Sequence, residues 1–129
     1  MFRINICERK PKDAIVSFGD LPHHRPEDVR DQTERMKGAF PKVARLRMFG
    51  ASSVDFSYLA AGKTEGVVLF TKNKWDIAPG LLLAKEAGAY LSDPDFHSYS
   101  FQCRGIVAAN SEELCKILTL QGDSYDSSQ

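Results

Sequence analysis

The stretch KVARLRMFGASSVDFSYLAAGKTEGVVLF, Lys42 to Phe70, predicts the layered fold of this chain. Residues 42–49 alternate apolar and polar side chains, as a half-buried strand does. Small residues at 50–53 form a turn, and residues 54–61 are typical of a helix that ends before Gly62. The last four residues, VVLF, predict a short strand buried on both faces. A strand, a helix and a second strand in this order indicate an α/β fold.

The rest of the sequence continues this alternation. We expect a helix from Pro26 that covers a surface through a narrow apolar seam of Val29, Met36 and Phe40. A second helix, from residue 76 to about 87, is apolar on most faces, which predicts that it is covered on more than one side. Further elements are predicted as strands at 2–7, 14–18, 90–91 and 105–109 and as a helix from Ser111 to residue 120. The chain is therefore predicted to be a layered α/β sandwich.

Composition limits the class of protein. The 129 residues suit a single domain, which we place at residues 1–120, with residues 121–129 as a frayed tail. Lys+Arg and Asp+Glu both number 17, so the net charge is zero, and a general electrostatic binder of nucleic acid is not expected. No window approaches the roughly 18 apolar residues that span a bilayer, so no membrane partner is expected.

The cysteines and the first residues bear on the cellular compartment. There are three cysteines, Cys7, Cys103 and Cys115, at spacings that form no CxxC motif. Few unpaired cysteines are typical of reduced intracellular proteins. No apolar run of a signal peptide follows Met1. The expected location is the cytoplasm.

The turn Gly50 to Ser53 is the first candidate for chemistry. It joins a predicted strand to a helix, and the first amides of a helix have no partner within it. Because the side chains of the turn are small, an anion such as phosphate, or a ligand rich in hydroxyl groups, could approach these amides. The alternative is that a serine of the turn caps the helix in the ordinary way. The pattern alone leaves both interpretations open.

The segment KWDIAPG, Lys74 to Gly80, is the second candidate. Asp76 stands where a helix cap belongs, and Pro79 is tolerated in the first turn of a helix. A capping carboxylate keeps a lone pair that could bind a hard cation such as Mg²⁺. One carboxylate is a poor cage for a divalent ion, which normally takes further carboxylates, waters or phosphate oxygens as well. Capping and metal binding therefore remain alternatives at this point.

The two turns lie within a longer pattern that resembles a known family. The segments FGASSVDFSYLAAGKTEG, WDIAPG, LLLAKEAGAYLSD and GIVAAN are similar, in order and spacing, to the carboxy-terminal half of the inositol monophosphatase family. The resemblance extends over about residues 2–118, and its most specific part is the WDxAxG signature at Trp75 to Gly80. We therefore expect the corresponding half of the family's αβαβα fold.

The resemblance also implies a function. Members of the family are Mg²⁺-dependent, lithium-sensitive phosphomonoesterases in which a metal-activated water attacks a phosphate ester. By position, Asp76 corresponds to a metal ligand, and Gly50, Ala51 and Ser52 correspond to the turn that contacts substrate. The implied cofactor is Mg²⁺, and the implied partner is a small phosphorylated metabolite.

Several departures from the family pattern qualify this expectation. The family's other metal ligands are a glutamate and a DPxDGT loop in its amino-terminal half, which we expect to be absent from this chain. The DPDF segment at Asp93 to Phe96 lacks the Gly-Thr of that loop and predicts a turn. Leu69 replaces a glutamate that contacts sugar hydroxyls in inositol-specific members, which argues against inositol phosphate as the substrate. Ser52 replaces the usual alanine.

Three functional hypotheses follow. In the first, the chain is part of a phosphatase that is inactive alone and needs a second chain or a missing half. In the second, it is a non-catalytic module that pairs with a homologue or with itself through exposed edges and apolar faces. In the third, it binds phosphate at Gly50 to Ser53 without a metal.

Overall fold

The computed structural model describes residues 8–23, 25–70, 74–100, 103 and 105–119, with the backbone alone for 74–76. Within these ranges the chain forms a five-stranded sheet of order β2-β1-β3-β5-β4. The strands are β1 (Ile15–Phe18), β2 (Arg45–Arg47), β3 (Gly66–Phe70), β4 (Tyr90–Ser92) and β5 (Gly105–Ala109). Strands β2, β1 and β3 are parallel, whereas β5 runs antiparallel to β3 and β4. The carboxyl ends of the three parallel strands therefore meet at one edge of the sheet.

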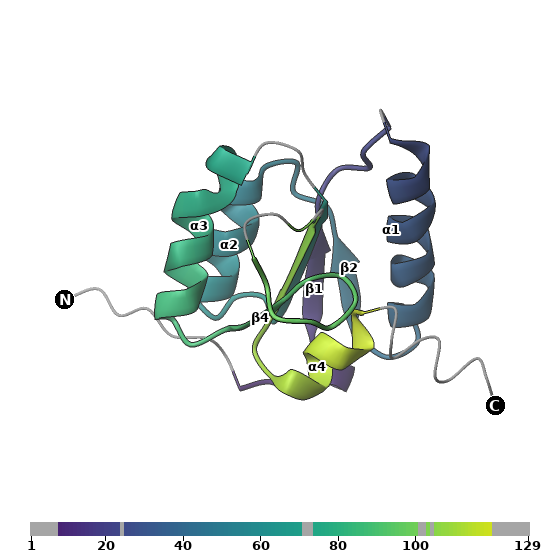
Figure 1. The fold of residues 1–129 in the computed structure, drawn as a ribbon. Coiled ribbons are helices and arrows are strands. Elements are labelled where there is room, and N and C mark those ends of the chain that lie inside the picture. Colours follow the sequence, from purple (N-terminus) through teal and green to yellow (C-terminus); the bar gives the residue numbers. More distant parts are fainter. Residues whose placement is uncertain (1–7, 24, 71–73, 101–102, 104, 120–129) are drawn as a thin grey trace.

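Helices cover both faces of the sheet, so the fold is a three-layer α/β sandwich (Figure 1). On one face, α2 and α3 enclose a core that includes Phe56, Leu59 and Ile77. On the other face, α1 and α4 pack over Phe18 and Leu114. The helices are α1 (Pro26–Ala39), α2 (Ser52–Ala60), α3 (Lys74–Glu86) and α4 (Glu112–Ile117), and a short 3-10 helix, η1 (Pro11–Asp13), precedes β1.

Most predicted elements are confirmed. Pro26 opens α1, and Gly62 lies just after α2 with a positive φ of 76°. Ser111 caps α4, because its side-chain oxygen accepts a hydrogen bond from the Leu114 amide at 3.1 Å. Strand β2 is shorter than the predicted 42–49, and α4 ends before residue 120. The predicted strand at 2–7 and the tail at 121–129 lie outside the described residues.

Two predictions about helix faces hold only in part. Met36 of the predicted seam packs against the core under α1, but Phe40 is 68% exposed, and the buried positions of the helix are Asp28, Gln32, Arg35 and Ala39. Within the described chain, α3 is covered on one side only, because Leu82 is 59% exposed while Ile77 and Ala84 are buried. The apolar sequence of α3 thus predicts a second covered face, and the described chain leaves that face exposed at Leu82.

The buried face of α1 is polar because Arg35 ties three distant segments together. Its guanidinium is fully buried and donates to the Pro94 carbonyl at 2.6 Å and to the Leu118 carbonyl at 3.1 Å. Asp31 neutralises the charge at 2.7 Å, and the guanidinium also stacks over the Phe70 ring. Buried charges are tolerated when they are paired and hydrogen-bonded in this way.

Glu65 has a similar role at the amino edge of the sheet. Its side chain is fully buried, and it accepts hydrogen bonds from the Ile15 amide at 2.7 Å and from Arg9 at 2.9 Å. Glu65 directly precedes β3, and its carboxylate gives the first amide of β1 a hydrogen-bond partner.

Candidate functional site

A cavity of about 190 Å³ lies where the parallel strands β2, β1 and β3 end. Ligands of open α/β sheets bind in crevices outside the carboxyl ends of the strands. Three connections meet here, namely the loop after β1, the turn between β2 and α2, and the end of β3 with the start of α3. The lining residues are Gly19, Asp20, Gly50, Ala51, Ser52, Asp55, Leu69, Phe70 and Ile77. The structure thus brings the three predicted substrate-contacting residues to one cavity.

The turn before α2 is built to leave helix amides available. Gly50 has a φ of 85°, a conformation that other residues adopt at a cost, and a Cβ there would meet open space. The cap position is Ala51, whose side chain can offer no hydrogen bond. The first bonds that close the helix run from the Val54 and Asp55 amides to the Ala51 carbonyl, both 3.1 Å, so the Ser52 and Ser53 amides precede the helical ladder. The alternative interpretation, a serine cap, was therefore wrong.

Asp55 lies one turn into α2 and is the unusual group of the site. It is fully buried, and neither of its carboxylate oxygens has a hydrogen-bond partner within the described chain. Burial raises the pKa of Asp55, and the charge of Asp20 adds to that rise. The buried Ser17 hydroxyl lowers the pKa in part, although its geometry falls short of a hydrogen bond with the carboxylate. A carboxyl group in such surroundings is driven toward its neutral form.

Asp20 brings a second carboxylate to the cavity, and this one is exposed. It follows Gly19, whose carbonyl accepts a hydrogen bond from the buried Gln32 side chain at 2.6 Å. The Gly19 amide donates to the Val68 carbonyl at 2.9 Å. The backbone that carries Asp20 is thus fixed to both α1 and β3.

The opposite wall of the cavity is apolar. Leu69 and Ile77 are 8% and 3% exposed and belong to the core between the sheet and α2 and α3. These two helices approach closely at Gly80, where an added Cβ would come within 2.8 Å of the Phe56 ring. The glycine of the WDxAxG signature is therefore explained by packing.

Asp76, the predicted metal ligand, is the third residue of α3 and not its cap, because the helix begins at Lys74. Its side chain lies outside the described residues, so metal binding stays a prediction. The next residue, Ile77, lines the cavity. In the part of the chain that is described, no group of three or more His, Cys, Asp or Glu side chains could hold a metal ion.

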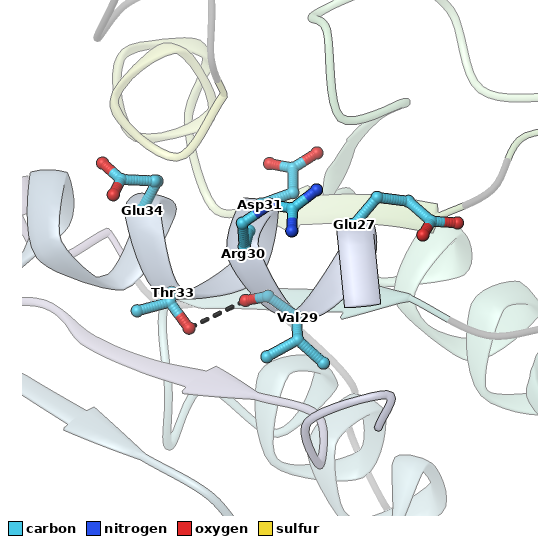
Figure 2. Close-up of a pocket in the computed structure, with 6 residues that line it drawn as sticks. All are labelled: Glu27, Val29, Arg30, Asp31, Thr33 and Glu34. Atoms are coloured by element: carbon cyan, nitrogen blue, oxygen red, sulfur yellow. Dashed lines mark hydrogen bonds between the residues drawn. The ribbon is translucent and has the colours of Figure 1, made fainter. Parts of the chain in front are cut away.

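Two other acidic regions carry no comparable arrangement. A hollow of about 530 Å³ runs along α1, and all six of its lining residues come from that one helix (Figure 2). Thr33 there donates to the Val29 carbonyl at 2.7 Å, a contact internal to the helix. In the DPDF segment, one oxygen of Asp93 accepts from the amides of Asp95 and His97. The prediction of a turn in this segment is confirmed.

Sequence reasoning missed Asp20 and Gln32. Asp20 follows a buried strand directly, so its place at a strand's carboxyl end could have marked it. Gln32 belongs to a helix face whose buried positions are mostly polar, and hydrophobic periodicity does not detect such a face.

Comparison with known proteins identifies the family. A model of the inositol monophosphatase family matches residues 2–123. The chain belongs to the inositol monophosphatase family.

The relatives have two kinds of name. The inositol-1-monophosphatase of Mesorhizobium japonicum is 30% identical over 109 residues, which are 84% of this chain and 41% of that protein. The Nus factor SuhB of Pseudomonas aeruginosa is 39% identical over 120 residues, 91% of this chain and 44% of that protein.

A solved structure gives the same result. The extragenic suppressor protein suhB of Bartonella henselae superposes with a TM-score of 0.79 at 27% identity, over 90% of this chain and 46% of that one. The chain thus spans less than half the length of these relatives, and it matches one part of the larger family members.

No helix among the described residues is long and apolar enough to cross a membrane.

Proposed function

We propose that this chain is the substrate-binding part of a metal-dependent phosphomonoesterase, and that it does not hydrolyse phosphate esters without further metal ligands. The supporting observation is the open turn at Gly50, Ala51 and Ser52, which presents unpaired helix amides to a cavity at the carboxyl edge of the sheet. Helix amides and the helix dipole favour an anion at such a place. The proposed ligand is the phosphate group of a small phosphorylated metabolite.

The charges of the cavity support a cation beside this phosphate. Asp20 and Asp55 both line the cavity, and a phosphate at the turn would be repelled by the negative charge of Asp20. Carboxylates are ligands of the kind that Mg²⁺ prefers. The donors fit Mg²⁺ in kind, but their number among the described residues falls short of a complete centre.

Asp76 is the residue that we propose to hold the metal on the α3 side of the cavity, together with carboxylates that this chain does not supply. When bound, Mg²⁺ would stabilise negative charge on the phosphate and lower the pKa of a bound water. The chain's own residues bind and orient: the Ser52 and Ser53 amides receive the phosphate oxygens, and Leu69 and Ile77 exclude water from one side. Leu69 is also why we do not propose inositol phosphate as the substrate.

Hydrolysis of p-nitrophenyl phosphate tests the catalytic part of the proposal. With Mg²⁺ present, we expect the pure 129-residue chain to release no p-nitrophenol above the rate of the Asp76→Asn variant. Hydrolysis that depends on Mg²⁺ and is lost in Asp76→Asn would refute the need for further ligands. Binding of inorganic phosphate, followed by NMR at the Ser52 and Ser53 amides, tests the turn separately. Binding that is unchanged by EDTA would favour a phosphate-binding module that uses no metal.

A non-catalytic interaction module is the second candidate, favoured by the outer face of α3. An apolar groove of about 460 Å³ runs between this helix and β4, with Leu82 at 59% exposure. Apolar patches of this kind mark protein contacts when they are contiguous. Light scattering tests this candidate: association that is lost in Leu82→Glu would support it, and a monomer that is stable on dilution would count against it.

A further inference from the structure

Asp20 lies where it could contact the part of a ligand next to the phosphate. It lines the same cavity as the Gly50 turn, yet it comes from the end of β1, whereas the proposed metal ligand Asp76 follows β3. Its exposed carboxylate makes no hydrogen bond or ion pair with another residue of the described ranges. The residue before it, Gly19, is held by hydrogen bonds to Gln32 and to Val68. A carboxylate that has no partner among the described residues can take a ligand group.

The charge of that group follows from the surroundings. Asp55 is buried against the same cavity with both oxygens lacking a hydrogen-bond partner in the described chain, so the floor of the cavity is acidic as well. A ligand whose carbon skeleton ends in an alkyl group would gain nothing from Asp20, and a terminal hydroxyl would gain one hydrogen bond without the attraction of opposite charges. A positively charged group there would be attracted by the exposed carboxylate of Asp20, and the oxygens of Asp55, unpaired within the described chain, could accept hydrogen bonds from it. The apolar wall of Leu69 and Ile77 suits the short carbon chain between the two charges.

We propose that Asp20 is a specificity-determining residue that selects small phosphate esters whose alcohol carries a primary ammonium group. The inference rests on the proposed function, since it requires the phosphate to lie at the Gly50 turn. The cavity of about 190 Å³ is below the 300–1,000 Å³ of drug-sized pockets, which favours a ligand with few carbon atoms. The ligand class is therefore a small amino-alcohol phosphate.

Three phosphate esters of nearly equal size provide the test. Phosphoethanolamine carries the ammonium, 2-hydroxyethyl phosphate carries a hydroxyl, and ethyl phosphate carries neither. We expect the wild-type chain to bind phosphoethanolamine roughly 1.5- to 5-fold more tightly than ethyl phosphate in EDTA, the range of an exposed ion pair. NMR titration of the Ser52 and Ser53 amides measures all three affinities and shows that the phosphate lies at the turn.

Two variants assign the preference to one carboxylate. Asp20→Asn keeps the shape of the side chain and should make the three affinities equal while leaving that for ethyl phosphate unchanged or higher. Asp13→Asn removes an exposed carboxylate from the opposite, amino edge of β1 and should preserve the preference.

The outcomes separate the two proposals. Equal binding of the three esters by the wild-type chain overturns the inference and leaves the phosphate-binding turn standing. No binding of any ester overturns the turn and the inference together. A third result would assign Asp20 to the metal: Mg²⁺ strengthens ethyl phosphate binding in the wild-type chain but not in Asp20→Asn. That result also overturns the inference.

Discussion

Replacing Asp55 by asparagine should change how the stability of the protein depends on pH. The carboxyl is fully buried and its oxygens have no hydrogen-bond partner in the described chain, so the native state disfavours its charged form. The pKa of Asp55 is accordingly raised in the folded protein by burial, then lowered in part by Ser17. A native state that holds a proton more tightly than the unfolded chain loses stability as the pH rises.

The sign and the size of the effect follow from this difference. Below the unfolded pKa of about 3.8 both states are protonated, and the neutral carboxyl makes its full contribution to stability. Between the unfolded and the folded pKa, one proton is lost on unfolding, so this group lowers the free energy of unfolding by about 1.4 kcal/mol per pH unit. Above the folded pKa the loss is complete and constant.

Urea denaturation of the wild-type chain and Asp55→Asn from pH 4 to pH 8 measures this slope. Because asparagine has nearly the same shape and does not titrate, the variant should gain stability relative to the wild-type chain as the pH rises and then reach a plateau. Asp13→Asn, which alters an exposed carboxylate, serves as the control. A stability difference between wild type and Asp55→Asn that is flat across this range, or that falls with pH, would refute the reasoning about the buried carboxyl.

Three further substitutions test the framework around the site, each by urea denaturation at pH 7. Gly50→Ala should cost about 1 to 2 kcal/mol through its positive φ alone, because a Cβ there meets open space, and a neutral result would mean that the turn relaxes. Glu65→Ala should cost about 1 to 3 kcal/mol, since it leaves the Ile15 amide without its partner, and a smaller loss would indicate that water replaces the carboxylate. Ser111→Ala should cost about 1 kcal/mol through loss of the cap to the Leu114 amide, whereas Ser111→Asp should retain most of the stability.

The strands and their order of alternation with helices could be predicted because the evidence for them is local. The strands β3 and β5 are apolar throughout and buried at every position, as their sequences indicate. The turn at Gly50 to Ser52 could also be identified, since a glycine and small residues between a strand and a helix indicate an open helix start. These features depend on residues close together in the chain.

The missed features depend on residues far apart. Hydrophobic periodicity predicts an apolar seam on α1. The helix also buries Arg35, because the carbonyls of Pro94 and Leu118 accept hydrogen bonds from its guanidinium. The environment of Asp55 likewise requires Ser17 from one strand and Asp20 from the loop that follows it. No pattern within one helix specifies such partners.

The contacts of Arg35 also bear on the order in which the chain folds during its synthesis. Its two carbonyl partners lie 59 and 83 positions later in the sequence. During synthesis, which adds about 5 to 20 residues per second, α1 emerges several seconds before the segments that supply these two carbonyls. Until Leu118 leaves the exit tunnel, the guanidinium lacks this carbonyl partner, although Asp31 of the same helix already pairs with its charge. The end of α4 therefore supplies the last hydrogen-bond partner of the buried Arg35 side chain.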